Sequence, residues 1–376
     1  MGAGIIGAAL ADRLTRPAPG GGPRSDEVTV VEADEPGAGT SGTSYAWFNA
    51  NDPEDPAYHR LRTEAMSTWR DLAAGFGDPP WYRPTGNTTW TSTHDEKTNL
   101  AERVAQLTAL GYAAELIDVE RLRGLEPHIQ APQDALIAHY PGEGYVHGGP
   151  ASRALIGRAR EAGAVIITGH RAATLNTDGD GDRVTGVRLD DGRDLDADVT
   201  ICAAGRHSPA LLATAGVTLP LVDPSEPGSA APCLVAFTSA AEGVVNGLVH
   251  TPGLSVRSAE HGGLNLEAPE DLDAGADEQP SPARLREAGV ELLARARTII
   301  PGCTAEITEV RRCVRPLPVD GYPLVGPQRP GLYTAVTHSG ITLGPHLAAL
   351  IDEEIHGRPA PALAPYRPGR GSLRRP

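Results

Sequence analysis

The sequence has one lysine, few cysteines and no long apolar run. Lys97 is the single lysine among 376 residues, so no G-K-S/T element exists and a P-loop nucleotide site is excluded. The four cysteines show neither C-x-x-C pairing nor metal-ligand spacing, which predicts no metal site and a reducing, cytoplasmic location. No apolar stretch approaches the roughly 20 residues of a membrane-spanning helix, so we expect no membrane span.

The chain carries an excess of negative charge. The formal net charge of −15 argues against nucleic acid as a partner, because its phosphates would be repelled along any long contact. Hydrophobic residues make up 40% of the chain, which is enough to bury a core. The length suits two domains, or one large domain with a lobed substrate region.

The most informative motif stands at the start of the chain. Gly2, Gly4 and Gly7 have the G-x-G-x-x-G spacing, and Ile5 and Ile6 open an apolar run typical of a helix. In this motif the first glycine permits a tight turn, the second lets the backbone approach a pyrophosphate, and the third allows close packing of helix on sheet. The N–H groups at the helix start then hold the phosphates. For this spacing taken alone, a glycine-rich surface turn is the alternative.

A candidate second strand, residues 26–32, ends in Glu32. The carboxylate of this residue can accept hydrogen bonds from both ribose hydroxyls and would repel a 2′-phosphate. The predicted ligand is therefore an FAD- or NAD-like dinucleotide rather than NADP. The distance along the chain from Gly7 to Glu32 is long because residues 17–23, rich in Pro and Gly, form an extended loop.

The strand that normally precedes this motif is missing. Met1 stands immediately before Gly2, whereas the glycine motif usually follows a buried strand at the centre of the sheet. Without that strand, buried N–H and C=O groups of its neighbours would each cost ~1–3 kcal/mol. We therefore expect the true reading frame to begin upstream and to add a short strand rich in Val and Ile.

Two further segments can approach the dinucleotide. In the glycine-rich loop 37–44, the small hydroxyl residues Thr40 and Ser41 can reach a pyrophosphate, with an ordinary linker as the alternative. The apolar strand 199–205 ends at Ala204 and Gly205. Its end suits a second backbone approach to the dinucleotide, and a plain strand with a terminal turn fits equally well.

The C-terminal third holds the most specific pattern. Residues 311–326 contain the run R-P-L-P-V-D-G-Y-P. Residues 331–345 combine a strand, a glycine turn and a helix start, which make a second anion-binding terminus. His338 could add positive charge there, and an ordinary loop histidine is the alternative. The residues expected at this helix start are Ser339, Gly340, Ile341 and Thr342.

Together, in this order, these segments resemble the FAD-dependent D-amino-acid oxidase family, which includes glycine oxidase, sarcosine oxidase and the D-amino-acid dehydrogenases. The resemblance covers nearly the whole chain, from Gly2 to Gly357. It implies an α/β fold with a discontinuous, Rossmann-like FAD-binding domain and a β-sheet-rich α+β substrate domain. The expected division is an FAD-binding domain of residues 1–75, 146–220 and 312–358, a substrate domain of residues 76–145 and 221–311, and a disordered tail of residues 359–376.

The resemblance also implies a reaction. A hydride passes from the CH–NH bond of a small amino acid (a D-amino acid, glycine or N-methylated glycine) to FAD, and the resulting imine hydrolyses to an oxo acid. Arg315 of the R-P run carries over as the partner of the substrate carboxylate, with an ion pair to Asp320 as the alternative. Cys313, two residues earlier, matches the place where sarcosine oxidases bond covalently to their flavin, with a small buried hydrophobe as the alternative.

The resemblance leaves the electron acceptor open. Sarcosine oxidases use a lysine near the flavin to activate oxygen, and residues 98–376 contain none. Oxygen and a quinone or other carrier therefore both stay possible, as do different amines and oligomeric states. Two other functions compete: an NAD-dependent dehydrogenase, which leaves residues 311–345 without a purpose, and a truncated or degenerate FAD-binding protein with little activity.

Overall fold

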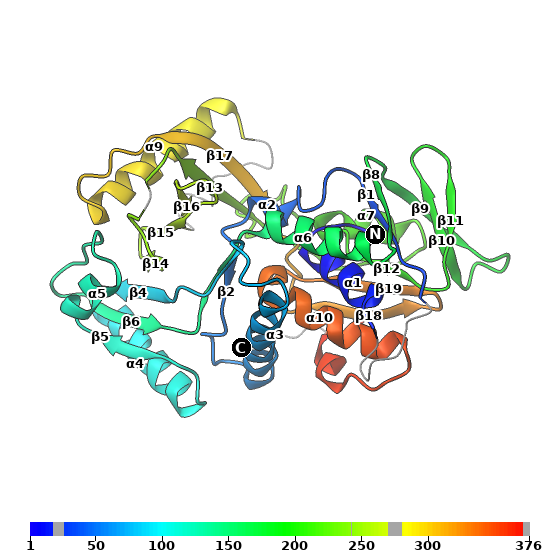
Figure 1. The fold of residues 1–376 in the computed structure, drawn as a ribbon, viewed down its shortest axis with the longest axis horizontal. Coiled ribbons are helices and arrows are strands. Elements are labelled where there is room, and N and C mark those ends of the chain that lie inside the picture. Colours follow the sequence, from blue (N-terminus) through cyan, green and yellow to red (C-terminus); the bar gives the residue numbers. More distant parts are fainter. Residues whose placement is uncertain (18–25, 242, 270–279, 371–376) are drawn as a thin grey trace. The chain divides into compact units, whose positions relative to one another are not determined.

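The computed structural model describes residues 1–17, 26–241, 243–269 and 280–370. The chain divides into two compact units (Figure 1). Unit 1 and unit 2 are both discontinuous in sequence, since the chain passes back and forth between them. Unit 1 consists of Met1–Gly42, Gly148–Asp223 and Val314–Pro376, and unit 2 consists of Thr43–His147 and Pro224–Cys313.

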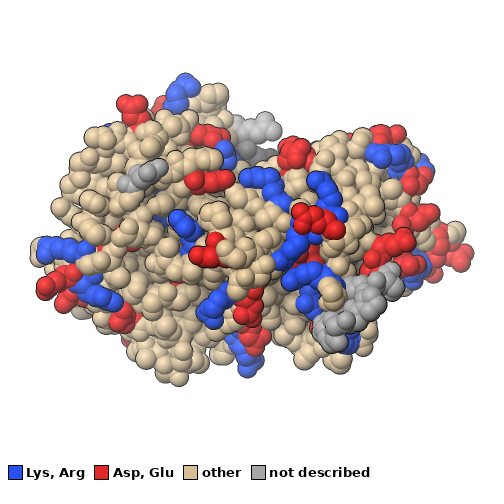
Figure 2. Space-filling model, viewed as in Figure 1, with Lys and Arg blue, Asp and Glu red and all other residues tan. Residues whose placement is uncertain are grey.

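Charged side chains of both signs are interspersed on the face shown in Figure 2. The negative excess of the chain is therefore not gathered into one patch on that face. Among the residues that the structure describes, no helix combines the length and the apolar character needed to cross a membrane.

Unit 1 contains two pairs of parallel strands, as expected of an α/β fold. Strand β1 (Thr29–Glu32) pairs in parallel with β8 (Val165–Thr168). Strand β12 (Thr200–Cys202) pairs in parallel with β19 (Leu332–Val336), and β19 pairs in antiparallel fashion with β18 (Leu324–Arg329).

The first residues of the chain lie between β1 and β12. The Gly2 N–H donates to the Val31 carbonyl at 2.8 Å, and the Met1 amino group donates to the Ile201 carbonyl at 2.8 Å. In return, the Ala203 N–H donates to the Met1 carbonyl at 2.9 Å. The backbone of Met1 and Gly2 thus links the two groups of parallel strands. A strand before Met1 concerns residues outside this chain and stays a prediction.

A separate antiparallel sheet projects from the same unit. It consists of β9 (Ala172–Thr177), β10 (Val184–Leu189) and β11 (Asp194–Asp196), with β10 in the middle. The Asp-Asp-Gly sequence 190–192 forms the turn from β10 to β11, where glycine supplies the positive φ of +88° that the turn requires.

Three helices pack together beside the parallel strands. Helix α1 (Ile5–Thr15) packs against both α6 (Gly148–Glu161) and α10 (Gly340–Ile355). The buried face of α1 is rich in alanine, which lets the neighbouring helices approach closely. Gly344 of α10 faces α1, because a Cβ at this position would make an ordinary van der Waals contact with Ile5 at 3.5 Å.

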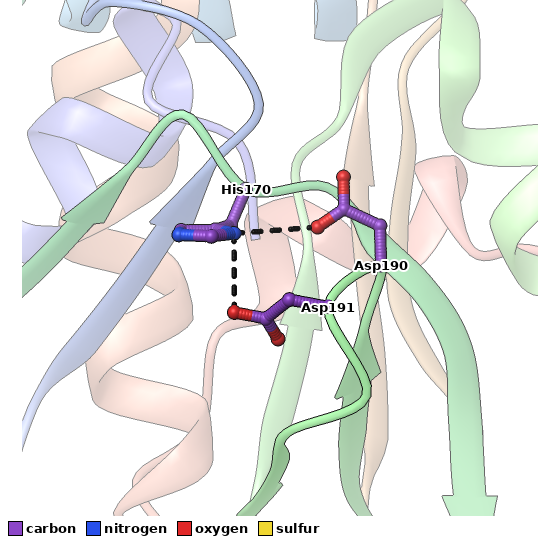
Figure 3. Close-up of side chains that lie close together, drawn as sticks. All are labelled: His170, Asp190 and Asp191. Carbon is purple, nitrogen blue, oxygen red and sulfur yellow. Dashed lines mark hydrogen bonds and ion pairs between the residues drawn. The ribbon is translucent and has the colours of Figure 1, made fainter.

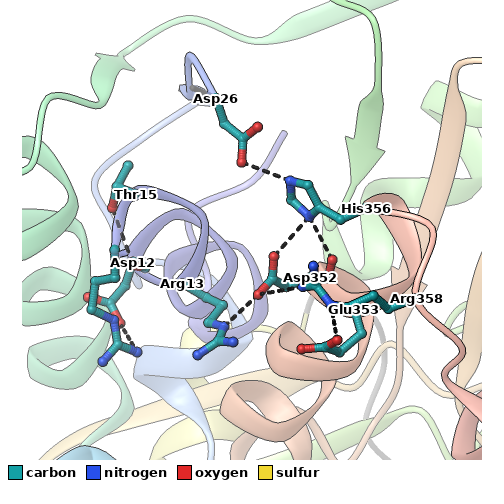
Figure 4. Close-up of polar contacts among 9 residues, drawn as sticks. Asp12, Arg13, Thr15, Asp26, Asp352, Glu353, His356 and Arg358 are labelled. Carbon is teal, nitrogen blue, oxygen red and sulfur yellow. Dashed lines mark hydrogen bonds and ion pairs between the residues drawn. The ribbon is translucent and has the colours of Figure 1, made fainter. Parts of the chain in front are cut away.

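Two buried carboxylates tie these helices to each other (Figure 4). Asp12 of α1 accepts hydrogen bonds from Arg158 of α6 at 2.6 and 2.8 Å. Asp352 of α10 accepts a hydrogen bond from Arg13 of α1 at 2.8 Å and lies 3.0 Å from the Nδ1 atom of His356. Because both carboxylates are at most 1% exposed, these pairs keep the charges of the helix interfaces compensated.

Unit 2 is built on an eight-stranded mixed sheet with the order β17-β13-β16-β15-β14-β4-β6-β5. Its strands are β4 (Asn87–Thr91), β5 (Glu115–Ile117), β6 (Leu136–Tyr140), β13 (Pro232–Thr238), β14 (Leu248–Thr251), β15 (Leu254–Ser258), β16 (Leu264–Glu267) and β17 (Ile307–Val314).

The two faces of this sheet differ in character. One face packs against α9 (Pro282–Ile299) and forms the main apolar core, with Trp90, Ile137, Val256 and Leu266 among its buried residues. Because side chains alternate along a strand, the neighbours of these residues point to the other face. That second face is polar in its middle part.

The remaining elements complete the two units. Helix α3 begins after Asp55, whose carboxylate accepts from the N–H groups of Ala57 and Tyr58 and caps the helix. The remaining helices are α2 (Thr40–Thr43), α3 (Pro56–Ala74), α4 (His94–Ala109), α5 (Val119–Leu125), α7 (Ser208–Ala213), η1 (Gly205–His207) and η2 (Pro361–Tyr366). The remaining strands, β2 (Trp47–Phe48), β7 (Gly144–Val146) and β3 (Tyr82–Arg83), form a three-stranded sheet in this order.

The division into units differs from the expected domains in one large segment. Residues 43–75, which we expected in the FAD-binding domain, belong to unit 2. The reason is that α3 packs its buried Trp69 against Tyr82, on a neighbouring segment of unit 2. The other boundaries differ from the expected ones by a few residues.

The expected disordered tail is corrected for residues 359–370. Leu363 and Tyr366 of η2 are buried, at 0% and 1% exposed, and Arg367 forms an ion pair with Glu354 of α10. The proline-rich composition suggested an open segment, yet these side chains anchor it to unit 1. Residues 371–376 of the tail, and residues 18–23 of the loop expected at 17–23, lie outside the described residues.

Candidate functional site

The glycine motif forms the turn that its spacing predicts. Gly2 has a φ of +89°, and a Cβ there would lie 2.5 Å from the Ala203 carbonyl oxygen. A Cβ at Gly7 would lie 1.9 Å from the carbonyl oxygen of Gly2. Side chains at either position are thus excluded, by backbone conformation at the first and by close packing at both.

Helix α1 begins directly after this turn and is capped from another segment. The Ile5 N–H donates to the Ser41 Oγ at 2.9 Å. A Cβ at Gly4 would lie 3.1 Å from the same oxygen. The first N–H groups of a helix have no partner inside it, so Ser41 satisfies one of them and the next, at Ile6, belongs to the same positive terminus. Thr40 donates instead to the Val314 carbonyl at 2.7 Å.

Glu32 stands at the carboxyl end of β1, where the prediction placed it. Its Oε2 accepts from the Ala3 N–H at 2.6 Å, and its Oε1 accepts from the Asp34 N–H at 3.0 Å. These bonds hold the carboxylate beside the glycine turn. A carboxylate offers about four acceptor positions, so two remain for hydroxyl groups of a ligand.

The turn after β12 approaches the glycine motif, as expected. A Cβ at Gly2 would lie 3.0 Å from the Cα of Ala204. Gly205 follows with a φ of +55° and opens η1. The turn 203–205 and the turn 2–7 therefore lie side by side at the edge of the parallel strands.

The start of α10 lies against the start of α1. A Cβ at Gly340 would lie 3.5 Å from the Ile5 side chain and 3.6 Å from the Ile6 side chain. Ser339 precedes the helix as its N-cap residue. His338 is exposed, and its Nδ1 lies 3.0 Å from the Ser339 Oγ. The expected residues Ile341 and Thr342 are buried in the first turn.

The start of α6 joins these two helix starts, which the sequence reasoning missed. A Cβ at Gly148 would lie 2.2 Å from the Ser41 carbonyl oxygen and 2.9 Å from the Ile341 side chain. The Gly148-Gly149 pair at a helix start was the available signal. Three helix N-termini therefore meet in unit 1, and each contributes positive charge and N–H donors.

Arg315 and its surroundings lie in the same unit. Arg315 is half-buried and follows β17 directly. Asp320, the alternative partner that we considered, has its carboxylate bound by Arg370, with the two groups 2.9 Å apart and 7% and 10% exposed. The negative charge of Asp320 is therefore already compensated by another arginine. The role of Arg315 toward a substrate stays a prediction.

Cys313 is the last residue of unit 2. It is 1% exposed and packs with Cys233, Val235 and Phe237. This apolar setting is the one expected of a small buried hydrophobe. The covalent link to a flavin stays a prediction.

The sequence reasoning also missed a buried carboxylate in unit 2. Glu143 is fully buried and accepts hydrogen bonds from the Trp47 indole at 2.9 Å, the Asn87 amide at 2.9 Å and the Tyr112 hydroxyl at 2.7 Å. Burial raises the pKa of Glu143 to about 7, although these hydrogen bonds oppose the shift. Through Trp47 of β2 and Asn87 of β4, Glu143 connects the three-stranded sheet of unit 2 to its eight-stranded sheet.

One surface cluster in the described chain has the composition of a metal site. The Nδ1 of His170 lies 3.4 Å from Asp190 and 3.3 Å from Asp191 (Figure 3). Asp191 is also paired with Arg193 at 2.7 Å, and both carboxylates are exposed. These contacts close the turn from β10 to β11, and we assign the cluster no further role.

Known proteins resemble this chain in sequence and in fold. A family model described as FAD dependent oxidoreductase matches residues 1–354. A D-amino acid dehydrogenase of Granulibacter bethesdensis is 29% identical over 164 residues, which are 43% of this chain and 38% of that protein. The match therefore spans well under half of this curated relative.

Solved structures match over almost the whole chain. Glycine oxidase from Geobacillus kaustophilus has a TM-score of 0.81 at 21% identity and covers 98% of this chain and 97% of its own. L-proline dehydrogenase from P. horikoshii has a TM-score of 0.80 at 20% identity, with 99% and 97% covered. Iminodiacetate oxidase from Chelativorans sp. has a TM-score of 0.78 at 22% identity, with 98% and 97% covered. At these identities the likeness establishes the fold and confirms the expected α/β class.

Proposed function

Because the chain belongs to the family of FAD-dependent oxidoreductases, we propose that it oxidises the CH–NH bond of a small amino acid with FAD as its cofactor. The family expected from the sequence is confirmed, and its cofactor is FAD rather than NAD. The proposed substrates are a D-amino acid, glycine or an N-methylated glycine. D-Amino acid dehydrogenase and glycine oxidase, which this chain resembles, act on such compounds by their names.

The observation that carries the proposal is the meeting of three helix N-termini beside Glu32. The starts of α1, α6 and α10 lie together, and the carboxylate of Glu32 stands at the neighbouring strand end. A dinucleotide has two phosphates for the helix starts and ribose hydroxyls for a carboxylate. At Gly2 and Gly7 the backbone is packed so closely that no side chain fits. The residues of unit 1 therefore fit FAD.

When bound, FAD accepts the hydride that leaves the substrate carbon. The contribution of the chain is to hold the substrate in one orientation and to compensate charge. The N–H groups of Gly340, Ile341 and Thr342 at the start of α10 would stabilise negative charge on the cofactor. His338, in the same loop, could add positive charge beside these N–H groups.

Arg315 would hold the carboxylate of the amino acid. A guanidinium presents two parallel N–H donors, which match the two oxygens of a carboxylate and define both the place and the orientation of the substrate. The following residue, Pro316, is buried and restricts the backbone. Water takes part after the hydride transfer, when it hydrolyses the imine product to an oxo acid.

The electron acceptor is part of the same test. Lys97 lies in α4, 3.3 Å from Asp134, and the rest of the substrate region contains no lysine. The reduced enzyme is therefore mixed with oxygen in one experiment and with an artificial quinone in another, and the rate of flavin reoxidation is compared. Faster reoxidation by the quinone defines a dehydrogenase, and faster reoxidation by oxygen defines an oxidase.

The deciding experiment is an anaerobic screen of the FAD-loaded enzyme. Glycine, sarcosine, proline and the D-amino acids are mixed with the protein, and the loss of flavin absorbance is followed. We expect one or more of these compounds to bleach the flavin, whereas the matching amines without a carboxylate should act far more slowly. If the chain binds FAD and no amino acid bleaches it, the chain is an FAD-binding protein without this activity.

A further inference from the structure

A row of polar side chains crosses the middle of the unit 2 sheet, on the face opposite α9. In the strand register, Asn87 of β4 stands opposite Leu248 of β14, Leu248 opposite Arg257 of β15, and Arg257 opposite Asn265 of β16. His250 lies two residues after Leu248 and therefore on the same face. This row belongs to unit 2, whereas the glycine motif and Arg315 belong to unit 1.

Arg257 is a buried cation in this row. It is 3% exposed, its Nε donates to the Tyr45 carbonyl at 2.5 Å, and its Nη1 donates to the Ser258 carbonyl at 2.8 Å. Its guanidinium lies 4.6 Å from the centre of the Tyr145 ring and 5.4 Å from that of Tyr45. Burial disfavours the charge of Arg257, and the carboxylate of Glu267 attracts it electrostatically. Burying a charge is costly unless its surroundings compensate it.

Three buried polar atoms around Arg257 have no hydrogen-bond partner among the described residues. They are the Tyr45 hydroxyl, the Asn265 Oδ1 and the His250 Nε2. The Tyr45 and His250 rings lie 5.5 Å apart, and Tyr45 and Asn265 are 3% and 1% exposed. Buried polar groups almost always have a partner, so three such atoms beside one cation indicate a ligand.

The hydrogen-bonding character of these atoms defines the ligand. The Asn87 amide N–H donates to Glu143, so its oxygen faces the His250 Nδ1 at 2.7 Å and accepts from it. The Nε2 of His250 is then an acceptor, and burial lowers the pKa of this histidine to about 3, which keeps the ring neutral. Burial raises the pKa of Tyr45, so its hydroxyl stays protonated and can donate.

We propose that Arg257 and Tyr45 form a carboxylate-binding subsite on the sheet of unit 2, with His250 and Asn265 as neighbouring acceptors. The guanidinium and the Tyr45 hydroxyl donate to the carboxylate, and the His250 Nε2 accepts from an N–H of the same ligand. A small amino acid has both groups. The binding of a carboxylate here does not rest on the proposed function, in which Arg315 holds the carboxylate of the substrate.

A purely structural role for Arg257 makes a different prediction. In that case the cation only attaches the segment around Tyr45 to the sheet through the backbone carbonyl, and the Tyr45 hydroxyl has no task. The substitution Tyr45→Phe separates the two roles. It removes a buried hydroxyl that has no protein partner, so the melting temperature should stay the same or rise, while the subsite loses a donor to a charged group.

The test is the binding of propionate to the full chain with FAD bound, measured by titration calorimetry with propionamide as the neutral control. We expect the parent to bind propionate and not propionamide. Tyr45→Phe should weaken propionate binding on the order of 10-fold or more. Tyr82→Phe, which removes a hydroxyl from a ring stacked on Phe48, is the matched control and should leave binding unchanged.

A second pair of variants tests the cation. Arg257→Gln should weaken propionate binding on the order of 100-fold. Arg311→Gln removes a half-buried arginine of the same unit, paired with Glu309, and should have no effect. If the parent fails to bind propionate, or if both Tyr45→Phe and Arg257→Gln bind it within threefold of the parent, the subsite is wrong. Because propionate is not oxidised, that result is independent of the flavin-bleaching screen.

Discussion

Arg315 is where a single side chain should matter most for the proposed reaction. Replacing Arg315 by leucine removes one member of a desolvated charge pair, which costs on the order of 2–5 kcal/mol. At 1.36 kcal/mol per decade this is roughly 30- to several-thousand-fold in kcat/KM for amino acids. Arg315→Lys should recover only part of the loss, because a point charge cannot replace the two parallel donors.

The measurement for Arg315 is steady-state turnover with an amino acid and with the matching simple amine. FAD content and the melting temperature should stay as in the parent, and turnover of the simple amine should change far less. Arg311→Leu changes a half-buried arginine that is paired with Glu309 and serves as the control. Amino-acid turnover within threefold of the parent in Arg315→Leu would show that the carboxylate is held elsewhere.

Glu143 should make the stability of the chain depend on pH. The pKa of this carboxyl is raised by burial from 4.5 to about 7. Between these two values the unfolded chain loses the proton while the folded chain keeps it, so the unfolded state binds fewer protons and stability falls as pH rises. A shift of this size corresponds to about 3 kcal/mol, at 1.36 kcal/mol per pKa unit.

The variant Glu143→Gln tests this sign. Its side chain can still accept from the Trp47 indole and the Asn87 amide, while its own N–H group can donate to the Tyr112 hydroxyl. Urea unfolding at pH 5 and pH 8 should show the parent losing stability between these values relative to the variant. A stability difference between the two proteins that does not change with pH would contradict the raised pKa.

At the scale of elements, α1 and α10 are joined by the ion pair of Arg13 and Asp352 (Figure 4). Asp352 is 0% exposed, so Asp352→Ala leaves Arg13 beside His356 without a counter-charge at the helix interface. We expect a loss of about 3 kcal/mol in the free energy of unfolding, measured by urea titration.

Asp26→Ala is the matched control for this helix interface. Asp26 lies 3.0 Å from the other ring nitrogen of His356, but it is exposed. An exposed ion pair contributes at most about 1 kcal/mol, so this variant should lose little stability. Equal losses in the two variants would mean that burial does not set the energy of the network.

For the whole molecule, FAD should act as a stabilising ligand of the folded chain. A ligand that binds the folded state alone adds about 2.7 kcal/mol at one hundred times its Kd, so the melting temperature should rise with added FAD. The Glu32→Ala variant should show a smaller rise, because it lacks the carboxylate for the ribose hydroxyls. Thermal scans over a series of FAD concentrations measure both; equal rises would remove Glu32 from the cofactor site.

Some features of this protein were determined by the sequence alone, because they depend on residues close together in the chain. The turn at Gly2 to Gly7 needs only its own spacing, and its positive φ and close packing are confirmed. The start of helix α9 is likewise set locally, because Ser281 accepts from the Arg284 N–H and Pro282 suits the first turn. The family and its cofactor follow from such local patterns in a specific order.

Other features were decided only by the tertiary structure, because their partners are far apart in the chain. No local rule places Gly148 of α6 against Ser41 and Ile341, or gives Asp320 to Arg370. The same holds for Arg257, whose neighbours come from β14, β16 and the segment at Tyr45. Spacing along the chain predicts a turn or a helix start, whereas the register of distant strands decides which charges and unpaired polar atoms come together.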